Sequence, residues 1–243
     1  MSDLAGKCAI VTGGSRGIGL GIARALLDCG CRVVICSRHE EQVSAAARSL
    51  GHPATQLIAC RADVGREQDV ARLFQVATEN FSRLDLLVNN AGNFDGGPIE
   101  TLSLDDWNNV LDACLTGQFL CTREAFRIMK PQGGGRILNI GSISAQRPRM
   151  HSTPYTSAKF GVQGLTQAAA LEGRSHGIVV SCLHPGNVLV ERRQDSDAAA
   201  DAEPMMTVET IVKAALAMLT MPSDVNFLEA IVLPVQQAYV GRG

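Results

Sequence analysis

The sequence predicts an α/β fold, a single-domain, doubly wound parallel sheet of about seven strands with helices on both faces. Seven short apolar runs, rich in β-branched residues, recur along the 243-residue chain. They are largely continuous rather than alternating, which is typical of strands buried on both faces. The segments between them show the apolar spacing of amphipathic helices. Strand and helix therefore alternate along the chain, and open sheets of this kind commonly form one domain of about 200–250 residues.

The seven expected strands lie at 8–11, 33–36, 57–60, 84–88, 136–140, 178–183 and 230–233. Two of the helices between them have clear signals. An apolar stripe over 208–219 follows Thr207, which we expect to be the N-cap. A second helix is expected to begin after Ser103, with Asp106 three residues later in a capping-box pattern, and to continue towards Met129.

Composition and charge exclude several classes of protein. The chain is 46% hydrophobic and 19% charged, which excludes a disordered or collagen-like chain. Its net charge of −2, without a block of like charges, gives no basis for nucleic acid or an anionic membrane as a partner. The sequence contains no run of about 18 apolar residues and no signal-like amino-terminal segment, so we expect no membrane span.

The eight cysteines indicate a reducing compartment. They form no Cys-x-x-Cys pair, and most lie within apolar runs such as Val33-Val34-Ile35-Cys36. Thiols in such runs pack as small hydrophobic groups, so we expect neither a metal site nor a disulfide. We therefore expect a cytoplasmic protein.

A glycine-rich turn follows the first expected strand. It reads Thr12-Gly13-Gly14-Ser15-Arg16-Gly17-Ile18-Gly19, and a helix-period segment begins at once. Glycines at these positions let the backbone approach a phosphate at a helix N-terminus, where free N–H groups and the helix dipole favour an anion. Such a turn can also serve the backbone alone. The strand-turn-helix context favours nucleotide binding.

Tyr155 and Lys159 form a second motif, Tyr-Thr-Ser-Ala-Lys. They lie one turn apart on the same face of a helix, where the lysine ammonium favours the phenolate form of a tyrosine. Ser142, thirteen residues before Tyr155, follows the strand at 136–140 and could hydrogen-bond the same substrate oxygen. The combination indicates general acid/base chemistry, although an isolated Tyr-x-x-x-Lys pair is usually an exposed helix face.

These motifs resemble the short-chain dehydrogenase/reductase family over nearly the whole chain. The glycine turn matches its Thr-Gly-x-x-x-Gly-x-Gly, and Asn89-Asn90-Ala91-Gly92 and Pro185-Gly186 match two further motifs. Ser142, Tyr155 and Lys159 match its catalytic serine, tyrosine and lysine in order and spacing. The resemblance implies a Rossmann-type fold, a nicotinamide cofactor and hydride transfer between that cofactor and a carbonyl or alcohol. Tyr155 would be the general acid/base, and Lys159 would also hold the nicotinamide ribose.

The resemblance also implies a cofactor site and a preference for NADP(H). In the family, an acidic residue at the position of Asp63 contacts the adenine ring. Ser37 stands where NAD-binding members usually carry an aspartate, and Arg38 and Arg16 could clamp a 2′-phosphate. The expected cofactor-binding residues are Gly13, Ser15, Arg16, Gly17, Ile18, Gly19, Ser37, Arg38, Asp63, Val64, Asn90, Ala91, Gly92, Tyr155, Lys159, Pro185, Gly186 and Val188.

Two positions depart from the family pattern. Cys114 stands at the fourth catalytic position, usually an asparagine that distorts its helix so that its main-chain carbonyl holds a water. A cysteine backbone could keep that role, and we expect the thiol itself to be core filler. Val190 replaces a cofactor-contacting threonine. The main hypothesis is an NADP(H)-dependent oxidoreductase that acts on a ketone, an aldehyde or the matching alcohol. The alternatives are a cofactor-binding protein without catalysis, and an epimerase or dehydratase on the same scaffold.

The substrate is expected to be a small carbonyl or alcohol. Variable loops form the walls of its site, so the sequence does not specify which compound binds. Residues 1–243 are expected to form one dinucleotide-binding and catalytic domain with a substrate lid at 187–206, although that polar segment could equally be a solvated connection. Arg147, Arg149 and His151 are either solvated or placed to meet an acidic substrate. His184 is expected to be structural.

We also expect a homodimer or homotetramer. Small residues at 158, 161, 164 and 168–170 allow close approach of the helix after Tyr155, and the family commonly pairs this helix and the Trp107 helix across a two-fold axis. The same small residues could instead pack internally.

Overall fold

The computed structural model describes residues 4–191 and 203–239. It contains one seven-stranded sheet in the order β3-β2-β1-β4-β5-β6-β7, and all strand pairs are parallel. Each strand overlaps its expected run. The strands are β1 (Cys8–Thr12), β2 (Arg32–Ser37), β3 (Leu57–Arg61), β4 (Leu86–Asn89), β5 (Gly135–Ile140), β6 (Ile178–Pro185) and β7 (Glu229–Val232).

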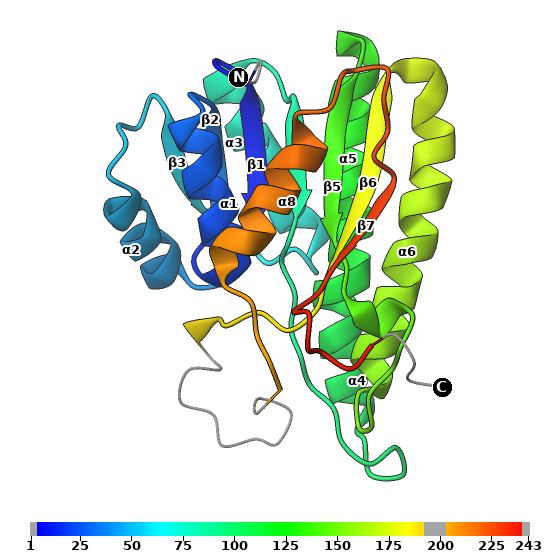
Figure 1. Ribbon diagram of the computed structural model, residues 1–243. Helices are drawn as coiled ribbons and strands as arrows, with labels where there is room; N and C mark the ends of the chain where they lie inside the picture. Colours follow the sequence, from blue (N-terminus) through cyan, green and yellow to red (C-terminus); the bar gives the residue numbers. More distant parts are fainter. Residues whose placement is uncertain (1–3, 192–202, 240–243) are drawn as a thin grey trace.

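Helices cover both faces of the sheet, as predicted. Figure 1 shows α1 (Gly17–Asp28) and α8 (Val208–Leu219) in front of the sheet, with α2 (Glu40–Leu50) beside β3. The opposite face is covered by α3 (Glu67–Phe81), α5 (Gly117–Gln132) and α6 (Thr153–Gly173). Alternate residues of β1 enter the two cores: Ala9 packs with the first group of helices and Ile10 with the second. The continuous apolar runs of the sequence thus reflect burial on both faces.

The order in which successive strands are added to the sheet reverses beside β1. From β1 the sheet grows first towards β2 and β3, and then on the other side towards β4 and the later strands. In open α/β sheets, the carboxyl ends of the strands at such a switch point form the ligand crevice. Here the turn after β1 is tied to the one after β4, because Asn90 Nδ2 donates to the carbonyl oxygens of Thr12 and Gly13 at 3.0 and 3.1 Å.

The helix expected from Ser103 is present but is not continuous. Ser103 caps α4 (Leu104–Leu111), and its hydroxyl accepts the Asp106 N–H at 3.0 Å, which confirms the predicted start. A π-helical segment, η1 (Asp112–Thr116), then separates α4 from α5. Thr207 occupies the N-cap position of α8, but its hydroxyl makes no capping bond and lies 3.4 Å from Thr210 Oγ1.

All eight cysteines are free thiols, and seven of them are buried. Burial raises the pKa of Cys31, Cys36 and Cys182 to about 12, so these thiols stay protonated at neutral pH. Cys31 packs as an apolar group in one core and Cys36 in the other. In the described ranges no helix combines the length and the apolar character that crossing a membrane requires.

Candidate functional site

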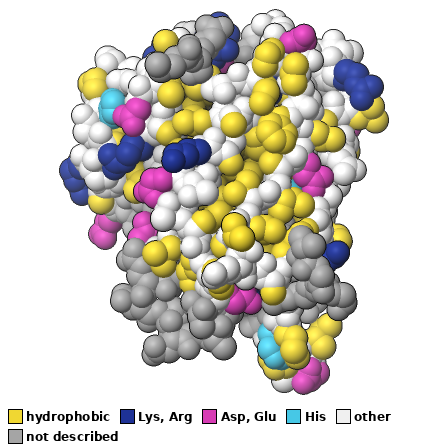
Figure 2. Space-filling view, viewed as in Figure 1, with side chains coloured by type: hydrophobic (Ala, Val, Ile, Leu, Met, Phe, Trp, Pro, Cys, Tyr) yellow, Lys and Arg dark blue, Asp and Glu magenta, His cyan; other side chains and the backbone are white. Residues whose placement is uncertain are grey.

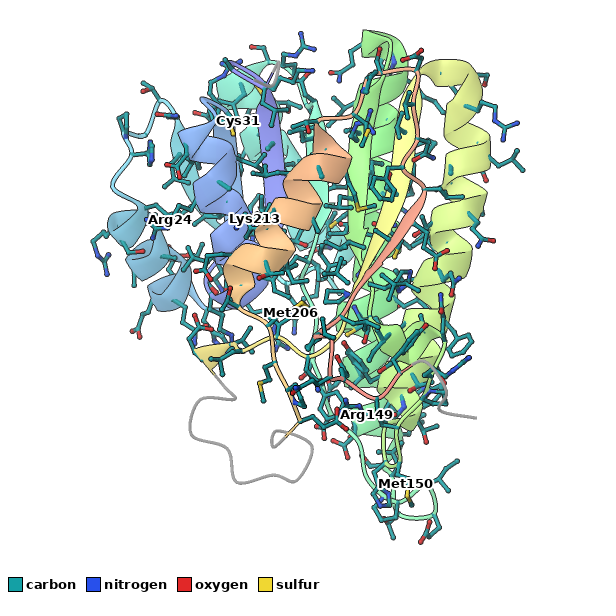
Figure 3. The ribbon with its side chains drawn as sticks, in the orientation of Figure 1. Arg24, Cys31, Arg149, Met150, Met206 and Lys213 are labelled. Atoms are coloured by element: carbon teal, nitrogen blue, oxygen red, sulfur yellow. The ribbon has the colours of Figure 1, made fainter. Side chains whose placement is uncertain are left out.

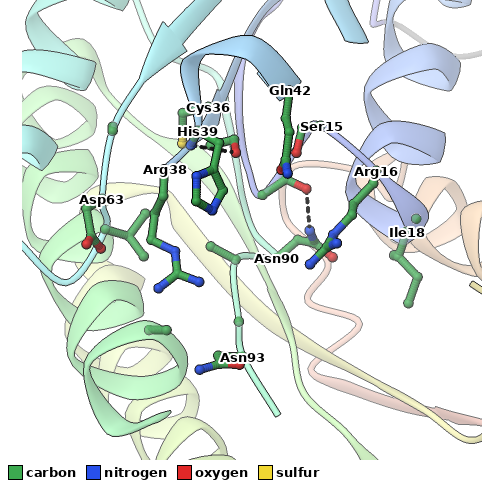
Figure 4. A pocket seen from close by; sticks show the side chains of 18 of the residues that line it. Ser15, Arg16, Ile18, Cys36, Arg38, His39, Gln42, Asp63, Asn90 and Asn93 are labelled. Atoms are coloured by element: carbon green, nitrogen blue, oxygen red, sulfur yellow. Dashed lines mark hydrogen bonds between the residues drawn. The ribbon is translucent and has the colours of Figure 1, made fainter. Parts of the chain in front are cut away.

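Two adjoining hollows open at the carboxyl ends of the strands. The larger, of about 430 Å³, lies within the usual size range of small-molecule sites. It is lined by the turn after β1 and by residues that follow β2, β3 and β4, as Figure 4 shows. The smaller hollow, of about 200 Å³, contains Ser142, Tyr155 and Lys159. Both are lined by Ile18, Asn90, Gly92, Asn93, Phe94 and Val190.

The glycine turn requires its glycines for two different reasons. Gly13 and Gly17 have φ angles of 62° and 54°, in the left-handed region that favours glycine. A Cβ at Gly13 would also lie 2.9 Å from the Cα of Ala91. Gly19 does not line the larger hollow; a Cβ there would collide with the Gly13 carbonyl oxygen. The turn therefore exposes the N-terminus of α1 to the hollow. The absence of a Cβ at Gly19 lets the start of α1 pack against the Gly13 carbonyl.

Two arginines project into the larger hollow. Figure 4 shows Arg38, from the segment after β2, and Arg16, from the glycine turn, on opposite walls. Ser37 lies beside them, and its hydroxyl accepts the His39 N–H at 3.3 Å. His39 and Gln42 line the same wall and were not predicted from the sequence. The arrangement offers cationic and neutral hydrogen-bond donors to an anionic ligand.

Asp63 and Val64, which follow β3, line the same hollow. One Asp63 carboxylate oxygen accepts the Gly65 N–H at 3.0 Å, and the Asp63 N–H donates to Asp69 at 3.0 Å. That backbone hydrogen bond lowers the pKa of Asp69. The carboxylates of Asp63 and Asp69 therefore hold this turn through hydrogen bonds from backbone N–H groups, and Asp63 lies at the wall of the larger hollow.

The structure brings the predicted serine, tyrosine and lysine together. Lys159 is buried; its ammonium donates to the Ile140 carbonyl at 2.8 Å and lies 5.5 Å from the centre of the Tyr155 ring. Phe94 packs edge-on against Tyr155, with ring centres 5.1 Å apart. Ser142 is held by its own turn, where its hydroxyl accepts the Ser144 N–H at 3.1 Å. A cation, a phenol and a hydroxyl thus line one small hollow beside the glycine turn.

His184 supports this hollow from behind. It is fully buried at the end of β6, with Nδ1 2.9 Å from the Ser142 carbonyl oxygen and Nε2 3.3 Å from Glu229 Oε1. Burial lowers the pKa of His184, whereas the contacts with Ser142 and Glu229 raise it. His184 does not line either hollow, which agrees with the structural role expected for it.

Cys114 lies inside η1 and is fully buried between Val110 and Ala158. Its thiol donates to the Asn93 carbonyl at 3.1 Å, and the Asn93 N–H donates back to its sulfur at 3.2 Å. The cysteine is therefore more than core filler, because it ties the helix to the loop that lines both hollows. A π segment leaves backbone carbonyls displaced from the regular helical pattern. The distortion implied for this position is thus present with cysteine in place of asparagine.

The end of β6 and the segment that follows it line the smaller hollow. Pro185, Gly186 and Val188 line it, and Val188 pairs with Met206 in a short parallel bridge. Residues 192–202, the larger part of the expected lid, lie outside the described residues. The lid prediction therefore stays a prediction.

Two of the three basic side chains near the substrate loops have partners within the chain. Arg149, labelled in Figure 3 at the same end of the molecule as Met206, donates to Glu203 at 2.6 Å and to Asn187 at 3.1 Å. Arg147 lies over the Tyr239 ring, with 5.8 Å to its centre. His151 is exposed. None of these three side chains lines either hollow, so the acidic-substrate hypothesis gains no support from them.

Comparisons with known proteins show what the chain is similar to. The family model "short chain dehydrogenase" matches residues 7–201. A 3-oxoacyl-[acyl-carrier-protein] reductase of Synechocystis sp. is 34% identical over 207 residues, which are 85% of this chain and 82% of that protein. An L-fucose dehydrogenase of Oryctolagus cuniculus is 33% identical over 91% of this chain and 77% of its own. The crystal structure of a protein from Agrobacterium tumefaciens, provisionally identified as a gluconate dehydrogenase, superimposes with a TM-score of 0.86 at 34% identity and covers 95% of both chains.

Proposed function

The chain belongs to the short-chain dehydrogenase family and is an oxidoreductase that acts on alcohol or carbonyl substrates with a nicotinamide cofactor, and we propose that this cofactor is NADP(H). The glycine turn, with its left-handed Gly13 and Gly17 at the N-terminus of α1, fits the diphosphate of a dinucleotide. Arg16 and Arg38 on opposite walls support the preference for a 2′-phosphate, since position 37 carries a serine rather than a carboxylate.

One observation carries the proposed mechanism: Ser142, Tyr155 and Lys159 line one hollow that adjoins the glycine turn. A nicotinamide held beside these three residues would supply or accept the hydride. Tyr155 gives its phenolic proton to the carbonyl oxygen on reduction and takes it back on oxidation. Ser142 donates a hydrogen bond to the same oxygen, and the Lys159 ammonium favours the phenolate that Tyr155 forms.

The tie between Cys114 and Asn93 supports catalysis over cofactor binding alone. At this position the π segment is present without the asparagine amide, and the Cys114 thiol makes both a donor and an acceptor contact with the Asn93 backbone. We propose that the substrate is a small-molecule alcohol or carbonyl compound. The free thiols support a cytoplasmic location.

The test is turnover with a defined set of compounds. The set contains simple ketones and aldehydes, 3-oxo acids, a 3-oxoacyl thioester, L-fucose and gluconate, the last three chosen from the relatives' names. We expect turnover with NADP(H) to exceed that with NAD(H). Product analysis distinguishes hydride transfer from epimerisation or dehydration.

Tyr155→Phe provides the matched control for this test. The variant keeps the ring but lacks the proton donor, so we expect turnover below a tenth of the parent rate with NADPH binding unchanged, measured by cofactor fluorescence. A variant that retains a tenth or more of the parent rate would remove Tyr155 from the proposed role. Cofactor binding without turnover of any compound would favour the non-catalytic alternative.

A further inference from the structure

Glu191 lies at the N-terminus of α1, far from it in sequence. The Gly17 N–H donates to Glu191 Oε1 at 3.2 Å. The second carboxylate oxygen, Oε2, is 3.6 Å from the position that a Cβ on Gly17 would take, and Val190 Cγ1 is 3.3 Å from the same point. Both Val190 and Glu191 line the larger hollow. The carboxylate of Glu191 is therefore placed inside the candidate cofactor site.

The N-terminus of α1 attracts this carboxylate. Arg16, its N-cap residue, makes no side-chain capping bond, and the first turn of the helix contains no acidic residue. The first N–H groups of a helix have no partner within the helix, and they carry the positive end of its dipole. Within the described residues, Glu191 supplies the anion that satisfies the N–H of Gly17.

The proposed function places the cofactor diphosphate at this same helix N-terminus, where it would need the same free N–H groups. Two anions cannot share one donor at the end of one helix, because their charges repel and each needs the same hydrogen bond. This inference rests on the proposed function: we propose that Glu191 competes, within the same chain, with the cofactor diphosphate. The Glu191 carboxylate must leave the Gly17 N–H before a dinucleotide binds. Glu191 therefore lowers the affinity of the chain for its own cofactor.

The position of this contact predicts which ligands it affects. NADPH, NADH and ADP-ribose all carry a diphosphate that would displace Glu191. Adenosine 2′-monophosphate carries the 2′-phosphate, which would meet Arg16 and Arg38, but has no diphosphate. Removal of the carboxylate should therefore tighten the binding of the first three ligands by a similar factor and leave the fourth unchanged.

The experiment measures dissociation constants of these four ligands by calorimetry for the parent, Glu191→Gln and Glu191→Ala. Glutamine keeps an acceptor without charge, so we expect diphosphate ligands to bind about threefold more tightly; alanine removes both, and we expect about tenfold. The control is Glu209→Gln, an exposed glutamate in the first turn of α8 that lines neither hollow. Thermal melting verifies that each variant is folded.

The outcomes separate the two proposals. Unchanged or weaker binding of NADPH, NADH and ADP-ribose by both Glu191 variants would overturn the competitor role and leave the proposed function standing. Equal tightening of adenosine 2′-monophosphate would also overturn it, because the effect would then be one of general charge. If the folded parent and variants bind no dinucleotide, the proposed function is contradicted, and the competitor role that rests on it is contradicted as well.

Discussion

Arg38 allows the cofactor preference to be tested at a single residue. Its guanidinium lies in the larger hollow, where it would donate to a 2′-phosphate that NADH lacks. Hydrogen bonds to charged groups contribute about 1.5–3 kcal/mol, which corresponds to roughly 10- to 100-fold in affinity. We therefore expect Arg38→Ala to raise the KM for NADPH by that factor and to leave the KM for NADH within about twofold.

Initial-rate kinetics with both cofactors measures this difference. Arg48→Ala is the matched control, because Arg48 is exposed on α2 and lies outside both hollows. An equal rise in KM for the two cofactors would contradict the preference for NADP(H).

Substitutions of Cys114 test whether the departure from the family pattern at this position affects turnover. Its thiol exchanges hydrogen bonds with the Asn93 backbone, and sulfur is a weak donor and acceptor. We expect Cys114→Asn to keep turnover within about threefold, and Cys114→Ala, which loses both contacts, to lower kcat by about two- to fivefold with the KM for NADPH unchanged. Single-turnover and steady-state rates measure both. A parent protein that is inactive, together with an active Cys114→Asn variant, would show that cysteine disables the enzyme.

At the scale of elements, Arg136 of β5 holds the end of α8. Its guanidinium is buried and donates to the carbonyl oxygens of Met218, Met221, Pro222 and Val225 at 2.9 to 3.4 Å. These are the last carbonyls of the helix and of the turn that follows it, which have no partner within the helix. Burial lowers the pKa of Arg136, but an arginine keeps its charge in proteins.

Arg136→Met keeps a long side chain and leaves these carbonyls without a donor. We expect the free energy of unfolding to fall by about 3 kcal/mol and Tm by about 6–12 °C. Calorimetry at fixed protein concentration measures the change. In the control, Arg127→Met, the lost arginine side chain is 63% exposed and Glu124 keeps its ion pair with Arg123, so we expect a loss below about 1 kcal/mol. Equal losses for the two variants would refute the capping role.

The elements that could be predicted from the sequence are those with local signals. The strands, the Ser103 cap and the glycine turn each depend on residues that are close in the chain, so composition and spacing were sufficient. The interruption of the helix at η1 has no such local signal; only the resemblance to the family implies a distortion at Cys114, and nothing near Cys114 in the sequence indicates its contact with Asn93. The contact of Glu191 with Gly17 likewise joins two distant segments.

The same distinction between local signals and long-range contacts explains which residues of the site could be predicted. Ser142, Tyr155 and Lys159 were predicted because a motif fixes their order and spacing, and the parallel sheet then places them at one edge. His39 and Gln42 line the larger hollow only because the chain turns after β2, and no pattern marks them. The positioning of Ser142 by His184 and Glu229 depends on three different strand ends. Contacts of this kind are set by tertiary packing, which the spacing of residues does not reveal.

At the scale of the whole molecule, the outer face of α6 carries an apolar stripe. The small residues expected there divide into two sets: Ala158 is buried and a Cβ on Gly161 would meet Leu115, whereas Gly164 faces open space within the described chain. Phe160 and Leu171, 49% and 64% exposed, lie on the same side of the helix as Gly164. Figure 2 shows a second gathering of hydrophobic side chains over α8 and β7.

A helix that exposes an apolar stripe with a glycine in its middle suits close packing against a second copy of itself across a two-fold axis. We therefore expect a homodimer or homotetramer, with a mass in light scattering at micromolar concentration of two or four times 25.8 kDa. Two charges in this stripe, Phe160→Glu with Leu171→Glu, would be buried without partners and should produce a folded species of lower mass. Met150→Glu, a change at a residue that is 85% exposed in a loop away from the stripe, should keep the parent mass. A parent protein that is only monomeric at this concentration would refute the assembly, and an unchanged mass in the double variant would move the interface to the face over α8 and β7.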